Sequence, residues 1–137
     1  MYKKVNELIT LLEETKKCEV KLINREKHTY FIESPNKIKY RERSKRFGKI
    51  HAGEKRLRID LIFPKGLLTV NDIKDYTNLD EKEEAHRRSS YFELVASNNN
   101  YETLAIFISR NQLDDYDFNS EDFSGLAERI VNANAAQ

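Results

Sequence analysis

The sequence predicts an α+β domain in which an antiparallel, twisted sheet of about five to six strands packs against an N-terminal and a C-terminal helix. Three observations lead to this prediction. Apolar residues recur at helical spacing near both ends of the chain, and they alternate with polar residues in several short central segments. Gly and Pro are scarce, at 4 and 2 of 137 residues. The length fits a single domain over residues 1–137.

The N-terminal segment has the pattern of an amphipathic helix, predicted over residues 2–17. Its apolar positions are spaced i, i+3, i+4 and i+7, so they share one helix face: Val5, Leu8, Ile9 and Leu12. Lys16 and Lys17 close the segment, and basic residues are favourable at the end of a helix.

Strand patterns follow this helix. Residues 18–22 alternate apolar with charged side chains, and residues 29–32 are β-branched and aromatic. Residues 33–36 include Pro35 and predict a turn. Residues 37–41 alternate basic with apolar side chains, which predicts a strand with one positive, solvent-facing surface.

The clearest strand pattern lies at residues 57–63. Its apolar residues alternate with Arg58 and Asp60, and Pro64 ends it. Residues 52–55 predict a hairpin turn that connects this strand to an earlier apolar segment containing Phe47 and Ile50.

The second half is less regular. Asn71 or Asp72 is expected to cap a short helix through Tyr76, and residues 81–88 are expected to form a helical turn or a loop. Residues 91–96 predict a strand, residues 97–100 a turn and residues 103–109 its hairpin partner. A helix from Tyr101 is the alternative, because Leu104, Phe107 and Ile108 also fit helical spacing.

An acidic loop at residues 114–117 leads to a last helix, which Ser120 is expected to cap. Its predicted buried face consists of Phe123, Leu126, Ala127, Ile130 and Val131. The tail from Asn132 is expected to fray.

Charge is distributed unevenly along the chain, although the net charge is only +1. Residues 1–70 hold 18 Lys and Arg against 9 Asp and Glu, whereas residues 71–137 hold 6 against 14. Ten of the basic residues lie within residues 37–58, against Glu42 and Glu54. A clustered positive field attracts phosphates, so this segment is the main functional prediction of the sequence.

The predicted nucleic-acid-binding surface is a sheet face on which Lys and Arg follow phosphates while Tyr40 and Phe47 offer rings for base stacking. Its predicted residues are Lys37, Lys39, Tyr40, Arg41, Arg43, Lys45, Arg46, Lys49, His51, Arg56 and Arg58. A solvated face balanced by the acidic half, within a monomer or a homodimer, and a surface for an acidic protein partner are the alternatives.

Two segments carry a family resemblance. They are Phe47-Gly48-Lys49-Ile50-His51 and the strand of residues 55–61, and the closing helix of residues 123–133 adds to them. This pattern resembles a family of uncharacterised small domains labelled predicted transport proteins, which are often appended to restriction-endonuclease-like domains. His86-Arg87-Arg88-Ser89-Ser90 departs from the glycine-containing turn of that family. The resemblance implies a sheet packed on helices and an association with nucleic-acid enzymes.

A small Mg²⁺-dependent nuclease is a further alternative. Asp60, Asp72 and Lys74 resemble the two carboxylates and lysine of restriction-type nucleases, which hold a metal ion and orient a water. Asp72 does not open a second predicted strand, however, and helix capping also explains it. The three histidines are far apart and there is no glycine-rich phosphate loop, so no zinc site and no cofactor is predicted.

The sequence therefore predicts a non-catalytic, nucleic-acid-associated binding module of a bacterial or phage system. A protein–protein adaptor or phage-type inhibitor that uses the charge asymmetry is the second hypothesis, with the acidic residues 114–122 as one candidate surface. No apolar run approaches the roughly 18 residues of a membrane-spanning helix, and one cysteine cannot form an internal disulfide. A cytoplasmic location without membrane partners is expected.

Overall fold

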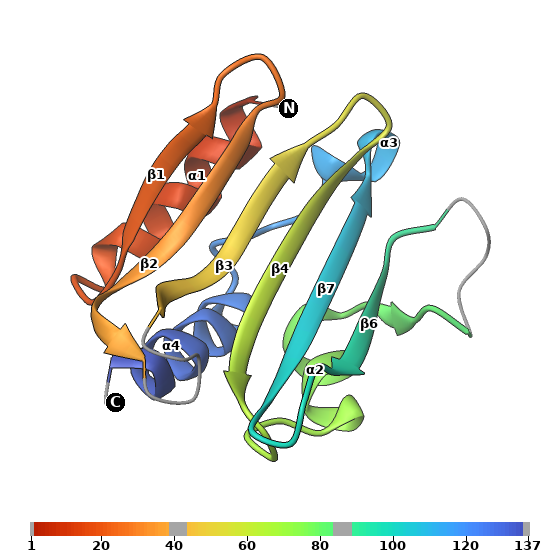
Figure 1. Ribbon diagram of the computed structural model, residues 1–137. Coiled ribbons are helices and arrows are strands. Elements are labelled where there is room, and N and C mark those ends of the chain that lie inside the picture. The colour runs from red at the N-terminus through yellow and green to blue at the C-terminus, as the bar shows by residue number, and fades with distance from the viewer. Residues whose placement is uncertain (1, 39–43, 84–88, 136–137) are drawn as a thin grey trace.

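The computed structural model describes residues 2–38, 44–83 and 89–135 (Figure 1). They form one seven-stranded sheet in the order β1-β2-β3-β4-β7-β6-β5. The strands are β1 (Glu19–Asn24), β2 (Thr29–Ile38), β3 (Ser44–Ala52), β4 (Arg56–Pro64), β5 (Asp80–Glu81), β6 (Tyr91–Ala96) and β7 (Tyr101–Ser109). All neighbours pair antiparallel except β5 and β6, which are parallel.

The helices of the described residues are α1 (Tyr2–Glu14), α2 (Val70–Thr77), α3 (Arg110–Leu113) and α4 (Glu121–Ala135). Figure 1 shows α1, α2 and α4 on one side of the sheet, while the other side carries no helix of the described ranges. This confirms the predicted α+β class with terminal helices. The strand count is higher than predicted because Asp80 and Glu81 form a two-residue strand beside β6.

The hydrophobic core lies between the sheet and the helices. Both terminal helices bury the faces that their spacing predicts, as Leu8 and Leu12 of α1 and Leu126 and Ile130 of α4 are at most 2% exposed. The sheet contributes alternate residues of β4, which are almost fully buried: Leu57, Ile59, Leu61 and Phe63. The period-two pattern therefore determines which face of β4 meets the helices.

The predicted turn at residues 33–36 is wrong, because β2 continues through Pro35 to Ile38. The pairing with β3 becomes irregular between Glu33 and Ile38. Such an irregularity accommodates a proline, which has no N–H to donate to a neighbouring strand. Ile38 is fully buried at the end of this strand.

The predicted fraying of the tail from Asn132 is also wrong, since α4 continues to Ala135. Asn134 is 1% exposed, and its Nδ2 donates to the carbonyl oxygens of Ile62 and Ile130 at 2.9 Å each. Ser34 Oγ donates to the Asn134 carbonyl oxygen at 3.5 Å. The side-chain amide of Asn134 thus bonds to β4 and its backbone carbonyl to β2, and these contacts fix the end of the helix against the sheet.

Thr69, rather than Asn71 or Asp72, is the N-cap of α2. Thr69 Oγ1 accepts from the Asp72 N–H at 3.1 Å, and the Asp72 carboxylate accepts from the Thr69 N–H at 2.9 Å. This reciprocal pair is a capping box, so Asp72 takes the third helical position. The hydrogen bond from the Thr69 N–H also lowers the pKa of Asp72.

No helix within residues 2–38, 44–83 and 89–135 is long and apolar enough to cross a membrane.

Candidate functional site

The sheet face opposite the helices is the first candidate for a functional surface, and we call it the open face. Because side chains alternate along a strand, the residues between the buried positions of β3, β4 and β7 point to this face. Pairing brings them together in rows, with Lys49 opposite Asp60, His51 opposite Arg58, and Arg58 opposite Phe107. Residues from β3, β4 and β7 thus form one continuous surface.

Arginine side chains lie over aromatic rings at two places on the open face. The guanidinium carbon of Arg46 is 4.4 Å from the centroid of the Phe31 ring. The guanidinium carbons of Arg56 and Arg58 are 4.8 and 5.0 Å from the centroid of the Phe107 ring. Phe107 is only 6% exposed although it belongs to the open face, because these side chains cover it. Contacts at these distances are cation–π interactions.

Tyr91 of β6 extends the second of these groups. Its ring centroid lies 4.8 Å from that of Phe107, and the planes are inclined by 32°. The Arg56 Nη1 donates to the Tyr91 hydroxyl at 3.1 Å, so Arg56 is held both by the ring beneath it and by the ring beside it. We call the residues Phe31, Arg46, Arg56, Arg58, Tyr91 and Phe107 the arginine–aromatic surface.

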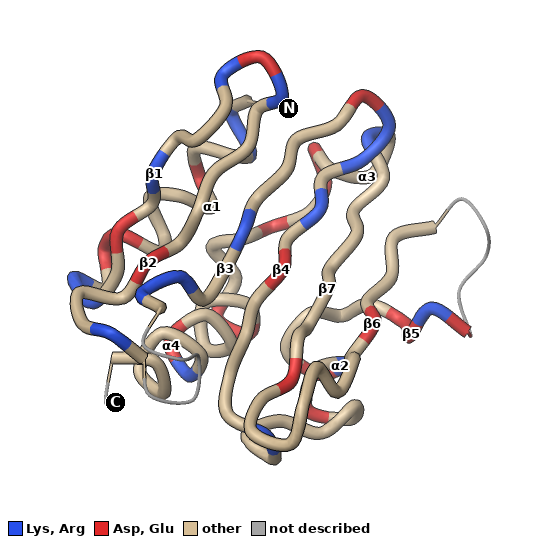
Figure 2. The backbone as a smooth tube through the Cα atoms, in the orientation of Figure 1, with Lys and Arg blue, Asp and Glu red and all other residues tan. Residues whose placement is uncertain are grey.

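The charges of the open face are mixed (Figure 2). Arg58 Nε donates to both carboxylate oxygens of Asp60, at 3.0 and 3.1 Å, although the Arg58 side chain remains 50% exposed. Lys21 Nζ lies 2.8 Å from Glu33 Oε1, and this hydrogen bond raises the pKa of Lys21. Lys49 is exposed and forms no ion pair with any described residue.

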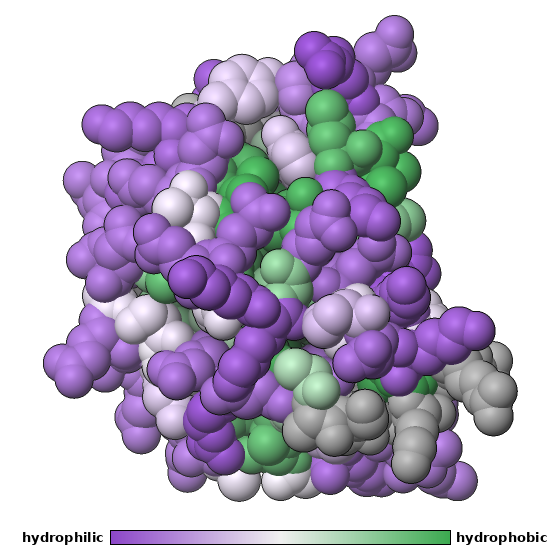
Figure 3. Space-filling view, turned by 90° about the vertical axis from the view of Figure 1, so that its left-hand side faces the viewer, coloured by the Kyte–Doolittle hydropathy of each residue, from purple (hydrophilic) through white to green (hydrophobic). Residues whose placement is uncertain are grey.

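Further basic residues lie at the side of the molecule next to β1. A cavity of about 210 Å³ is lined there by Lys16, Lys17, Lys21 and Lys45, together with Glu19 and Glu33. Figure 3, which views that side, shows a mainly hydrophilic surface with hydrophobic side chains in its upper part. Leu22 and Ile23 of β1 are 44% and 51% exposed.

The structure brings part of the predicted nucleic-acid-binding set together. Arg46, Lys49, His51, Arg56 and Arg58 share the open face. Lys37 is exposed near the end of β2, and Lys45 is exposed at the start of β3. Lys39, Tyr40, Arg41 and Arg43 lie outside the described residues. Phe47 is fully buried in the core, so the prediction that its ring is available for stacking is wrong.

Sequence reasoning missed Phe31, Tyr91 and Phe107 as members of a surface. Their neighbours in the chain are core residues, and each reads as part of an apolar strand. The registers β2–β3, β4–β7 and β6–β7 place them on the open face. One signal in the sequence could have found them. Side chains alternate between the two faces of a strand, so an aromatic residue directly next to a buried residue points to the opposite face.

The proposed nuclease residues are not brought together. Asp60 is bound to Arg58 on the open face, whereas Asp72 belongs to α2, on the helix side of the sheet (Figure 1). Lys74 lies on the same helix as Asp72. Among the described residues there is no group of three or more His, Cys, Asp or Glu side chains that could hold a metal ion.

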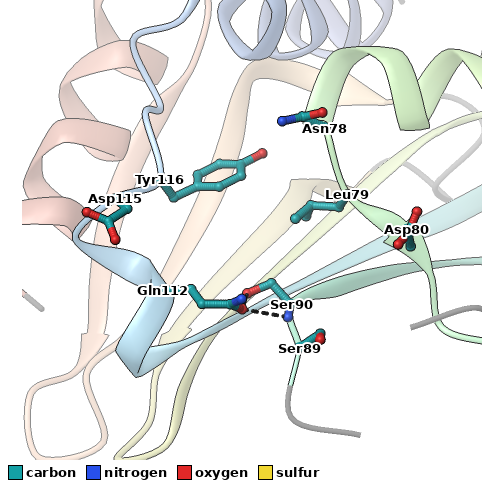
Figure 4. Close-up of a pocket in the computed structure, with 8 residues that line it drawn as sticks. All are labelled: Asn78, Leu79, Asp80, Ser89, Ser90, Gln112, Asp115 and Tyr116. Atoms are coloured by element: carbon teal, nitrogen blue, oxygen red, sulfur yellow. Dashed lines mark hydrogen bonds between the residues drawn. The ribbon is translucent and has the colours of Figure 1, made fainter. Parts of the chain in front are cut away.

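Two cavities of about 410 Å³ each lie away from the open face. Figure 4 shows one of about 410 Å³, lined by Asn78, Leu79, Asp80, Ser89, Ser90, Gln112, Asp115 and Tyr116. Gln112 Oε1 accepts from the Ser90 N–H at 2.8 Å and from the Ser90 hydroxyl at 2.6 Å. An amide cannot take a proton from a serine, so Gln112 does not act as a general base for Ser90. Asp80 and Asp115 lie on opposite sides of the cavity in Figure 4.

Tyr116 lies between this cavity and a second one of about 410 Å³. Its hydroxyl donates to the Thr77 carbonyl oxygen at 2.6 Å, and its own carbonyl oxygen accepts from Lys4 Nζ at 2.8 Å. Burial raises the pKa of Tyr116 far above its ordinary value. Tyr116 is therefore a protonated structural link between α1, α2 and the loop before α4.

This raised pKa predicts a loss of stability in alkali. The unfolded chain releases the Tyr116 proton near pH 10, whereas the folded protein retains it. The stabilisation is complete below about pH 10 and decreases as the pH rises further. In urea denaturation from about pH 8 to pH 11, the free energy of unfolding should fall more steeply for the wild type than for Tyr116→Phe. Parallel curves for the two proteins would contradict this assignment.

Comparison with known proteins finds no matching family model, no matching curated protein and no matching solved structure. The family resemblance of residues 47–61 and of the last helix therefore stays a prediction.

Proposed function

We propose that this domain is a non-catalytic nucleic-acid-binding module and that the open face is its interface. The arginine–aromatic surface is the observation that carries the proposal. Arg46, Arg56 and Arg58 supply positive charge at fixed positions, and guanidinium groups pair well with phosphate. Lys49 adds an exposed ammonium group between the two aromatic centres.

The mixed charge of this face indicates binding of moderate strength and low sequence selectivity. Asp60 and Glu33 neutralise Arg58 and Lys21 in the free protein, so a phosphate has to compete with these carboxylates. Contacts to phosphates position a protein on nucleic acid without reading the bases. Elevated salt should therefore weaken the complex strongly.

A titration of labelled single- and double-stranded oligonucleotides at low and at physiological salt tests the proposal. With about four phosphate contacts, the logarithm of the binding constant for a single strand should fall with the logarithm of the salt concentration with a slope near −3. Mg²⁺ is included and the oligonucleotide is analysed afterwards on a gel, where intact strands are expected. Absence of binding at low salt would refute the module, and cleaved strands would support the nuclease alternative instead.

A protein–protein module is the second candidate, and the β1 edge favours it. Leu22 and Ile23 are exposed on a strand whose outer edge pairs with no other described strand. Open strand edges with apolar side chains can pair with another chain. Ile23→Lys should weaken such a complex and leave oligonucleotide binding unchanged. Substitutions at Lys49 should weaken oligonucleotide binding and leave the protein complex unchanged.

A further inference from the structure

The arginine–aromatic surface carries a more specific inference, which rests on the proposed function. Both of its centres place a planar cation on top of a ring, Arg46 over Phe31 and Arg56 with Arg58 over Phe107. We propose that the ligand is a single-stranded polynucleotide whose bases stack on these guanidinium groups and on Tyr91.

The guanidinium groups are held in place before any ligand arrives. Arg56 contacts the Phe107 ring and donates to the Tyr91 hydroxyl, and Arg58 contacts the same ring and donates to Asp60. The arginine side chains therefore lose less conformational freedom on binding than free side chains would. Arg56 and Arg58 remain exposed, and an arginine plane is a stacking surface for an unpaired base.

The two centres are spaced for two bases of one strand that are not adjacent to each other. Phe31 lies on β2 and Phe107 on β7, with β3 and β4 between them, so the centres are at least three strand spacings or about 14 Å apart. The registers also offset Phe107 by two residues along the strands from the row of Phe31. Other sheets that bind single strands stack two or three bases across their strands. Lys49 and His51 occupy β3 between the centres, where the backbone of a crossing strand would pass.

Double-stranded nucleic acid fits this face less well. The bases of a duplex are stacked within it, so only phosphates, sugars and base edges are available to a protein. No helix or strand pair of the described residues projects from the open face to enter a groove (Figure 1). Stacking therefore gives a single strand an advantage that a duplex does not have.

The first test compares wild-type affinities for oligonucleotides of about twelve nucleotides. Single-stranded DNA, single-stranded RNA and the corresponding duplexes are titrated by fluorescence anisotropy at low salt. We expect the single strands to bind at least about tenfold more tightly than the duplexes. Equal or tighter duplex binding would overturn this inference and leave the proposed function intact, whereas no binding to any oligonucleotide would refute both. The DNA and RNA arms show which single strand is preferred.

The second test keeps the charge and removes the planar groups. In Arg46→Lys/Arg56→Lys/Arg58→Lys, we expect single-strand affinity to fall about tenfold while duplex affinity and the salt slope change little. Quenching of 2-aminopurine in the bound single strand should also decrease. Unchanged single-strand affinity and quenching in a variant with wild-type thermal unfolding would overturn the stacking role.

Discussion

Replacing Lys49 and Arg56 together by glutamate is expected to reduce affinity for a single-stranded oligonucleotide at low salt by about 100-fold or more. Both side chains are exposed on the open face, and neither forms an ion pair within the described part of the chain. Two cations that face the ligand become two anions, and the one at position 49 lies opposite Asp60. The salt slope should become shallower by about one to two.

The matched control for this variant is Lys3→Glu/Lys65→Glu. It changes the net charge by the same amount, but Lys3 lies on α1 and Lys65 follows β4, and both are exposed. Binding isotherms of the two variants at one salt concentration separate the local effect from the effect of net charge. Equal losses in both variants would mean that the open face is not the interface.

Replacing Phe118 by alanine is expected to lower the free energy of unfolding by about 3–5 kcal/mol. Phe118 is fully buried between two other rings, with its centroid 5.0 Å from that of Phe123 and 5.1 Å from that of Tyr116. Alanine leaves a cavity and removes both edge-to-face ring contacts. These contacts join the loop before α4 to the first turn of α4, which packs behind the sheet.

Chemical denaturation of Phe118→Ala and Phe118→Leu measures this effect. Leucine fills much of the same volume as phenylalanine. The decrease in the free energy of unfolding should therefore be smaller for Phe118→Leu than for Phe118→Ala, by about 2 kcal/mol or more. A loss under about 1 kcal/mol for the alanine variant would show that these rings do not anchor α4.

The elements that could be predicted from the sequence are those with an unambiguous period. β4 alternates in strict period two, and α1 and α4 repeat their apolar residues at helical spacing, so their buried faces were predicted correctly. The pattern of residues 101–109 is compatible with a strand and with a helix, because β7 is buried on both faces and its apolar residues do not alternate with polar ones. Ala105 and Phe107 are 5% and 6% exposed. Pairing with both β4 and β6 establishes the strand.

The open face could be predicted only in part, because charge can be read from the sequence but register cannot. The basic cluster of residues 37–58 indicated the region, and alternation placed Arg58 on the solvent side of its strand. The contacts of Arg56 and Arg58 with Phe107 join residues about fifty positions apart. Arg46 and Phe31 lie on the adjacent strands β3 and β2. The order of the C-terminal tail could not be predicted for the same reason, since Asn134 is bound to Ile62 on β4.

An NMR titration of the isotope-labelled protein with a single-stranded oligonucleotide tests most directly whether the open face is the interface. We predict that the largest amide shift changes will occur at Phe31, Lys49, Arg58 and Phe107, with little change in α1 and α4. Shift changes gathered on those helices, or around the cavity of Asn78 and Asp115, would contradict the account.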